Sequence, residues 1–166
     1  MKKLIFFALS ALILQSCRVS YSFSGTSIQQ DVNTIYIELF EYKALLVNPT
    51  LSNEPTEKIR DQFRRLTKLE QVDGNSDLEL SGAITGYSIS AQAISANEQA
   101  TQNRLTVEVS INFVNNKHPE DNVEQKFSAY ADFPSSTPLS SVESSLCEEI
   151  IGKLTEDIFN ATVAQW

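Results

Sequence analysis

The residues of this chain best suited to binding chemistry are cations, three of them spaced along one predicted helix. Arg60, Arg64 and Lys68 recur at i, i+4 and i+8, which places them in one stripe. Arg104 and Lys126 lie on or beside predicted strands. Guanidinium and ammonium groups bind phosphates and carboxylates, so these five residues predict contact with lipid phosphates or with the acidic rim of a partner. For the stripe, a solvated helix face that balances nearby acids is the commoner interpretation, and we favour it.

Catalytic groups are sparse. His118 is the only histidine and stands beside Pro119 in a predicted turn, where we expect it to be solvated. One histidine and no pair of free cysteines exclude the usual zinc sites. No nucleophile-elbow sequence or glycine-rich phosphate loop is present. We therefore expect no enzyme and no cofactor, although a small periplasmic hydrolase that uses a carboxylate pair stays an alternative.

The start of the chain combines a targeting signal with a cysteine. Met1-Lys2-Lys3 precedes an apolar run over Leu4–Leu14, in which Ser10 is the only polar residue. This pattern is typical of a secretory signal, and the run is too short to span a bilayer. Its end, Leu14-Gln15-Ser16-Cys17, resembles the lipobox of bacterial lipoproteins. The resemblance implies cleavage before Cys17 and a diacylglycerol on its sulfur; an ordinary cleaved signal with an incidental cysteine is the alternative.

Length and composition predict one domain behind that anchor. We expect a signal peptide over residues 1–16, a lipidated tether over 17–31 and a single α+β domain over 32–166. Removing Lys2 and Lys3 leaves 11 basic against 21 acidic residues, which argues against a nucleic-acid partner. No acidic residue directly follows Cys17. By resemblance to lipoprotein sorting rules, we expect the periplasmic face of the outer membrane.

Alternating apolar and polar residues predict four strands, over Thr34–Phe40, Leu78–Ala91, Leu105–Phe113 and Val123–Phe133. In the second strand the apolar phase shifts, so Gly82 and Gly86 predict a bulge or bend. Short polar segments over 93–101 and 115–122 join the last three strands. Sequential strands with short connections indicate an antiparallel meander.

Two amphipathic helices complete the predicted domain. The first begins near Ser52 or Asn53, either of which can cap it. Ser140 and Glu143 match a capping box for the second, which runs to about Ala164. Cys147 lacks a disulfide partner and is expected as a buried residue of that helix. The order β-α-β-β-β-α predicts an α+β fold with a four-stranded, mostly antiparallel sheet and both helices on one face.

Several stretches, in their order and spacing, are similar to one known family. They are Tyr21–Gly25, Val47–Ser52, Asn103–Leu105, Phe127–Tyr130 and Asp157–Thr162. The chain thereby resembles, over essentially all of its mature length, the lipopolysaccharide-assembly lipoprotein family (LptE) in its Bacteroidetes form. The resemblance implies two helices on a four-stranded sheet, in agreement with the pattern above.

The same resemblance carries expectations about function. Family members form a complex with the large outer-membrane β-barrel (LptD-like) that inserts lipopolysaccharide, sit inside it as a plug, help it assemble and bind lipopolysaccharide without catalysis. Only Cys17 transfers residue by residue, because the family's lipopolysaccharide-contacting basic residues lie in no motif that aligns with this chain. An auxiliary lipoprotein of another envelope transport complex is the alternative, and co-purification separates the two.

Overall fold

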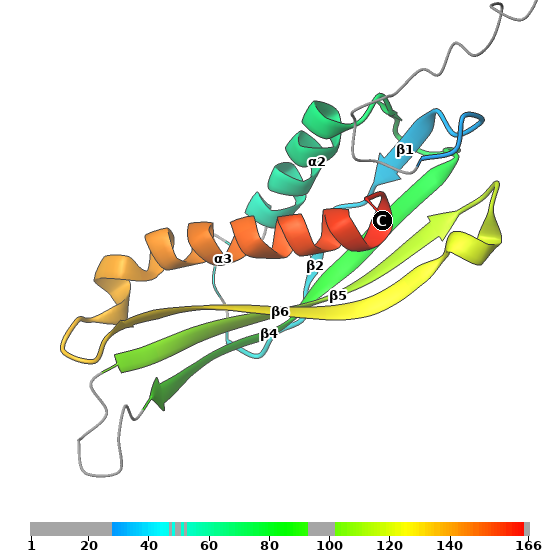
Figure 1. Ribbon diagram of the computed structural model, residues 1–166. Coiled ribbons are helices and arrows are strands. Elements are labelled where there is room, and N and C mark those ends of the chain that lie inside the picture. The colour runs from blue at the N-terminus through cyan, green and yellow to red at the C-terminus, as the bar shows by residue number, and fades with distance from the viewer. Residues whose placement is uncertain (1–27, 47, 49–50, 52, 93–101, 165–166) are drawn as a thin grey trace, which may run out of the picture.

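The computed structural model describes residues 28–46, 48, 51, 53–92 and 102–164 (Figure 1). The predicted lipid attachment at Cys17 and the predicted 93–101 loop lie outside the described residues. The elements in chain order are β1 (Thr34–Ile37), β2 (Glu41–Tyr42), α2 (Glu54–Leu66), β3 (Glu70–Gln71), β4 (Leu78–Gln92), β5 (Gln102–Asn115), the 3₁₀ turn η2 (Pro119–Asp121), β6 (Val123–Pro134) and α3 (Leu139–Thr162). Among them, no helix is long and apolar enough to cross a membrane.

The sheet has six strands and is mixed, so the prediction of a four-stranded, mostly antiparallel sheet was wrong. Its order is β3-β1-β4-β5-β6, and β2 also pairs with β4. The β4-β5-β6 meander is antiparallel as predicted, whereas β1 and β2 run parallel to β4. The parallel pairing arises because α2 returns the chain to the end of the sheet where β1 began.

The predicted first strand, Thr34–Phe40, is interrupted. The strand β1 ends at Ile37, and β2 begins at Glu41, just beyond the predicted end. Both pair with the same edge of β4, with Ile37 opposite Leu80 and Glu41 opposite Ala83. Between them the chain turns Phe40 into the core, where it is only 2% exposed. The amide of Phe40 donates a 3.0 Å hydrogen bond to the buried Thr56 hydroxyl on α2. Helix and edge strand are thus joined at the interruption.

A bulge in β4 keeps its apolar residues on one face. Ile84 pairs with Val109 and Gly86 with Glu108, so Thr85 is the extra residue. The shift confirms the bend predicted from Gly82 and Gly86. A Cβ atom at Gly82 would lie 2.7 Å from the Phe40 ring, so the position needs a glycine.

Both helices cover one face of the sheet (Figure 1). α3 packs on β6 and β5, and α2 packs against α3, with the Phe63 and Phe159 rings edge to face at 5.2 Å. The opposite face, which we call the open face, carries the residues that alternate with the buried ones on β5 and β6. This two-layer arrangement agrees with the predicted α+β class.

The helix starts differ from the predictions. α3 begins at Leu139 with Pro138 before it, and no side-chain cap is formed. Ser140 is therefore inside the helix, and the predicted capping box was wrong. Asn53 precedes α2, as predicted, but its side chain makes no capping bond. Glu143 instead turns inward to a buried polar cluster described below.

Candidate functional site

The structure does not bring the five predicted cations together. Arg60, Arg64 and Lys68 follow α2 and the residues after it, in the helical layer. Arg104 and Lys126 alternate with buried or half-buried neighbours on β5 and β6, so they lie on the open face. Lys68 and Lys126 are both exposed and make no ion pair with any residue that the structure describes. The ligand-binding assignment of the five residues stays a prediction, and it cannot describe one compact site.

Arg60 ties its helix to the edge of the sheet. Its guanidinium donates to the carbonyl of Ile37 at 2.7 Å and to Glu57 at 2.8 Å. Arg64 pairs with Asp61 at 2.6 Å, and the two side chains are 63% and 61% exposed. An exposed pair one helical turn apart contributes at most about 0.5 kcal/mol. The stripe therefore contains one cross-linking residue and one solvated ion pair.

Arg104 belongs to the best-defined charged arrangement, at the outer edge of the sheet. It donates two hydrogen bonds to Asp132, of 2.7 and 2.8 Å, and its guanidinium carbon lies 3.6 Å from the centre of the Tyr130 ring. Lys153 of α3 reaches the same strand, donating to the Tyr130 carbonyl at 2.9 Å and to Glu149 at 2.7 Å. We call Arg104, Tyr130, Asp132 and Lys153 the edge cluster.

Electrostatics in the edge cluster favour the charged forms. The Arg104 hydrogen bonds lower the pKa of Asp132, and Asp132 in turn raises the pKa of Arg104. Tyr130 is 46% exposed, and the side chains of Arg104 and Lys153 are 30% and 47% exposed. Such groups suit phosphates and sugar hydroxyls. Sequence reasoning missed Tyr130 and Lys153, because only pairing across β5 and β6 and the packing of α3 bring them to Arg104.

A buried polar cluster lies between the β2 side of the sheet and α3. The amide of Asn48 donates to Glu143 at 2.8 Å, and more weakly to Tyr87 at 3.4 Å and to the Cys147 sulfur at 3.7 Å. The Tyr87 hydroxyl donates to Glu143 at 2.5 Å. Burial raises the pKa of Tyr87, and burial together with the nearby Glu143 raises that of Cys147 to about 11. The thiol stays protonated at neutral pH, and the prediction that Cys147 is buried is confirmed.

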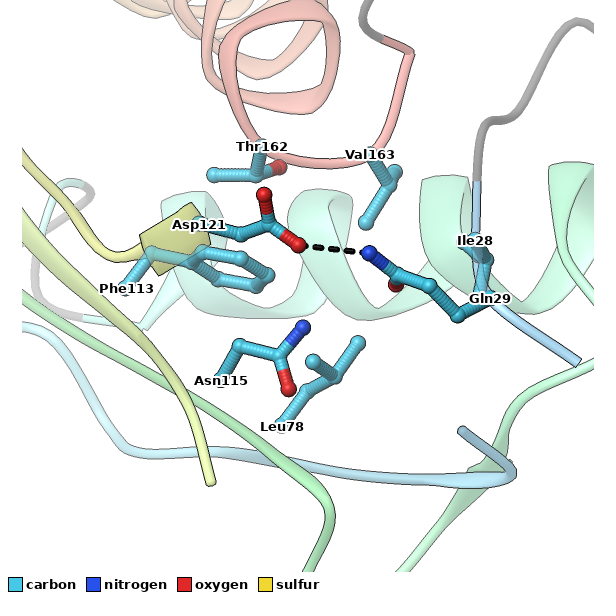
Figure 2. Close-up of a pocket in the computed structure, with 8 residues that line it drawn as sticks. All are labelled: Ile28, Gln29, Leu78, Phe113, Asn115, Asp121, Thr162 and Val163. Carbon is cyan, nitrogen blue, oxygen red and sulfur yellow. Dashed lines mark hydrogen bonds between the residues drawn. The ribbon is translucent and has the colours of Figure 1, made fainter. Parts of the chain in front are cut away.

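Figure 2 shows a small pocket where the N-terminal segment meets the end of α3. Leu78 and Phe113 line it, and Gln29 donates to Asp121 at 2.5 Å across it. Its volume is about 50 Å³. A buried water needs at least roughly 10–15 Å³ by the same measure. The pocket has room for a few waters and none for a lipid or sugar. We call this contact between the N-terminal segment and the end of α3 the seam.

An ion cluster fastens that seam. His118, which was predicted to be solvated, is partly exposed, at 29% for its side chain, and lies 3.1 Å from Asp31. Asp31 raises the pKa of His118 and has its own pKa lowered by it. Beside them Lys117 lies 3.1 Å from Asp77. The turn between β5 and β6 thus holds the segment that leads into β1.

These features define a two-layer α+β domain. Across the described ranges, no three His, Cys, Asp or Glu side chains gather in a way that could hold a metal ion. The sequence profile of the LptE family, described as lipopolysaccharide-assembly, matches residues 32–162. The chain belongs to this family, which confirms the resemblance, and the family is one of non-enzymatic envelope lipoproteins.

Solved structures support the same fold. Rare lipoprotein B from Shewanella oneidensis is 14% identical, with a TM-score of 0.53 over 76% of this chain and 92% of its own. Lipoprotein B from Nitrosomonas europaea is 12% identical, with a TM-score of 0.51 over 76% and 79%. A minor lipoprotein from Acinetobacter baumannii is 11% identical, with a TM-score of 0.50 over 76% and 89%. A comparison with curated proteins found no match.

Proposed function

We propose that this protein is an outer-membrane lipoprotein that plugs the lipopolysaccharide-inserting β-barrel, assists its assembly and so contributes to lipopolysaccharide transport to the outer leaflet. The observation that carries the proposal is the family match, which spans residues 32–162 and hence every strand and helix of the sheet-and-helix unit. A rigid wedge with polar outer faces suits the hydrophilic lumen of a large barrel. The wedge acts by binding, and no catalytic step is part of the proposal.

Membrane attachment in this proposal is through Cys17, with residues 1–16 removed and 17–31 as the tether. Several acyl chains hold a domain on a membrane, since each buried methylene contributes roughly 0.8 kcal/mol. The seam around Gln29, Asp31 and His118 supports this view because it fastens the last residues of the tether to the domain. A fastened exit sets the point at which the tether leaves the domain, and tethering raises the concentration of the domain near the barrel.

Lipopolysaccharide binding is the finer part of the proposal, and the edge cluster is its best-supported location. Arg104 and Lys153 offer cations beside an exposed aromatic ring. Charge reversal at Arg104 and Lys153 should weaken lipopolysaccharide binding, whereas reversal at Arg64, which lies on α2 outside the edge cluster, should change it little. Equal binding by all of these variants would remove the edge cluster from the proposal.

The test of the proposed function is a tagged pull-down from detergent-solubilised outer membranes, with wild type and Cys17→Ala. A stoichiometric large β-barrel in the wild-type eluate supports the proposal. Loss of membrane attachment in Cys17→Ala, measured by fractionation, supports the anchor. Membrane-bound wild-type protein that captures no barrel would contradict the plug function and favour an auxiliary role in another envelope transport complex.

A further inference from the structure

The strand β6 forms a long outer edge of the sheet. It pairs with β5 over its whole length, and no other strand of the described residues lies on its far side (Figure 1). An edge strand presents a row of backbone N–H and C=O groups to any strand that comes beside it. On the opposite side of the sheet, β2 and β3 have only two residues each. β6 is therefore the place where the sheet can be extended by another long strand.

Two observations show which backbone groups of β6 point away from β5. In an antiparallel ladder the N–H and C=O of one residue face the same neighbour, and successive residues alternate. The amide of Asn116 donates to the carbonyl of Asp77, so the even-numbered residues of β5, Thr106 among them, face β4. Tyr130 is opposite Thr106 and must then face outward, and its carbonyl accepts a hydrogen bond from Lys153 of α3. The outward-facing residues of β6 are Glu124, Lys126, Ser128, Tyr130 and Asp132.

Charge on this edge restricts which strand can pair with it. Lys126 lies in the middle of the strand, is exposed and makes no ion pair with any described residue. A lysine in such a position hinders strand pairing unless the incoming strand places an acid opposite it. β6 carries an acid of its own at Asp132, which already accepts two hydrogen bonds from Arg104 and has further lone pairs. A second copy of β6 can therefore supply the charge that Lys126 lacks.

Two-fold symmetry and the backbone directions leave few registers for such a pair. Outward-facing residues must lie opposite one another, so the strands can shift only in steps of two residues. With Lys126 opposite Asp132 of the second copy, symmetry creates the same ion pair twice. A shift in one direction places Glu124 opposite Asp132, which are like charges. A shift in the other direction places Lys126 opposite Pro134, which has no amide to donate.

We propose that β6 pairs antiparallel with β6 of a second copy, with Lys126 of each copy opposite Asp132 of the other. The pairing joins two sheets into one, and it is independent of the proposed function. Ser128 lies opposite Tyr130 and exchanges backbone hydrogen bonds with it, while the Tyr130 carbonyl can still accept from Lys153 through its second lone pair. The two-fold axis passes at Ala129, whose small side chain permits the close approach of a non-hydrogen-bonded pair.

Disulfide crosslinking of the full-length protein tests the register. Ser128→Cys mixed with Tyr130→Cys should give a covalent dimer under mild oxidation, because hydrogen-bonded partners have Cα atoms about 5.5 Å apart. Either variant alone should give far less, since equal positions are diagonal, at about 7–8 Å. Ser88→Cys mixed with Ser128→Cys is the matched control, because Ser88 is exposed on the interior strand β4. Wild type, whose Cys147 is buried, gives the background.

Charge reversal supplies the second test. On a Lys126→Glu background, the mixed crosslink should form at least about tenfold less, because two ion pairs become two like-charge pairs. Lys68→Glu, which changes an equally exposed lysine after α2, should leave the yield unchanged. Thermal unfolding of both reversed variants should match wild type, since exposed side chains are replaced.

Three results would overturn the self-pairing. The first is a mixed crosslink no stronger than the Ser88 control, and the second is a yield that Lys126→Glu does not lower. The third is a crosslink from Ser128→Cys in cell envelopes to other proteins only, which would assign the edge to a different partner. None of these results bears on capture of the barrel, so the proposed function is tested separately.

Discussion

The two sides of the sheet differ in strand length and in the direction of strand pairing. β4, β5 and β6 pair over 12 or more residues each and bury one face through regular alternation. β1, β2 and β3 are four, two and two residues long and pair in parallel. In a long antiparallel ladder the stability is spread over many similar contacts, so a single substitution removes only a small part of it. The short side depends on a few particular side chains, so substitutions there should have larger effects.

The largest effect is expected at Gly82, the β4 residue against which Phe40 of the short side packs. In Gly82→Val, side-chain atoms would meet the Phe40 ring at under 3 Å, beside the Ser110 carbonyl at 3.0 Å. We expect a loss of about 3 kcal/mol in unfolding free energy, at the upper end for an overpacked core, measured by urea unfolding. Gly152→Ala is the matched control: a Cβ there meets nothing within 4 Å, and the change should stabilise α3 by about 0.5–1 kcal/mol. Equal stability of both variants would contradict the close approach of Phe40.

Asn48 should come next. Asn48→Ala leaves Glu143 and Tyr87 with fewer partners in a buried setting, so we expect a loss of about 1–3 kcal/mol. Asn53→Ala, an exposed residue with no capping bond, should stay within about 0.5 kcal/mol of wild type. Chemical denaturation of the two variants compares a buried with an exposed amide. Similar losses would indicate that the polar cluster does not hold the segment after β2.

Asp77 tests the short side through pH. Hydrogen bonds from the amides of Asn33 and Thr34, together with Lys117, lower the pKa of Asp77 from 3.8 to about 2. A lowered folded-state pKa contributes stability that is fully present above pH 3.8 and is lost as pH falls through about 2. Asp77→Asn should lower the melting temperature by about 2–4 °C at pH 7 and converge with wild type near pH 2. If the melting temperatures of wild type and Asp77→Asn differed by the same amount from pH 7 to pH 2, the lowered pKa of Asp77 would be contradicted.

The smallest effect is expected at Ser140, on the regular side. Because α3 begins at Leu139 without a side-chain cap, Ser140→Ala should change the unfolding free energy by less than about 0.5 kcal/mol. A loss near 1 kcal/mol, typical of a removed cap, would restore the capping box predicted from sequence. Thermal unfolding in one buffer suffices for this comparison.

The meander was predictable because its information is local. Leu105, Val107 and Val109 alternate with polar neighbours, and that period alone assigns a strand with one buried face. The interruption at Phe40 was not predictable, because the apolar alternation continues through Ile37 and Leu39 while Leu39 ends 53% exposed. What turns Phe40 inward is the missing side chain of Gly82 and the hydroxyl of Thr56, both far along the chain.

The candidate sites divide in the same way. The sequence by itself determined that Arg104 is a cation at the start of a strand, that Cys147 lies on the buried face of a helix, and that the domain belongs with the LptE family. Only the tertiary structure decided that Arg104 meets Tyr130 and Lys153, that Asn48 meets Glu143 across 95 residues, and that Leu45 is left uncovered. Periodicity records which face of an element is buried, whereas side-chain partners depend on which elements become neighbours, and that is set by packing of the whole chain.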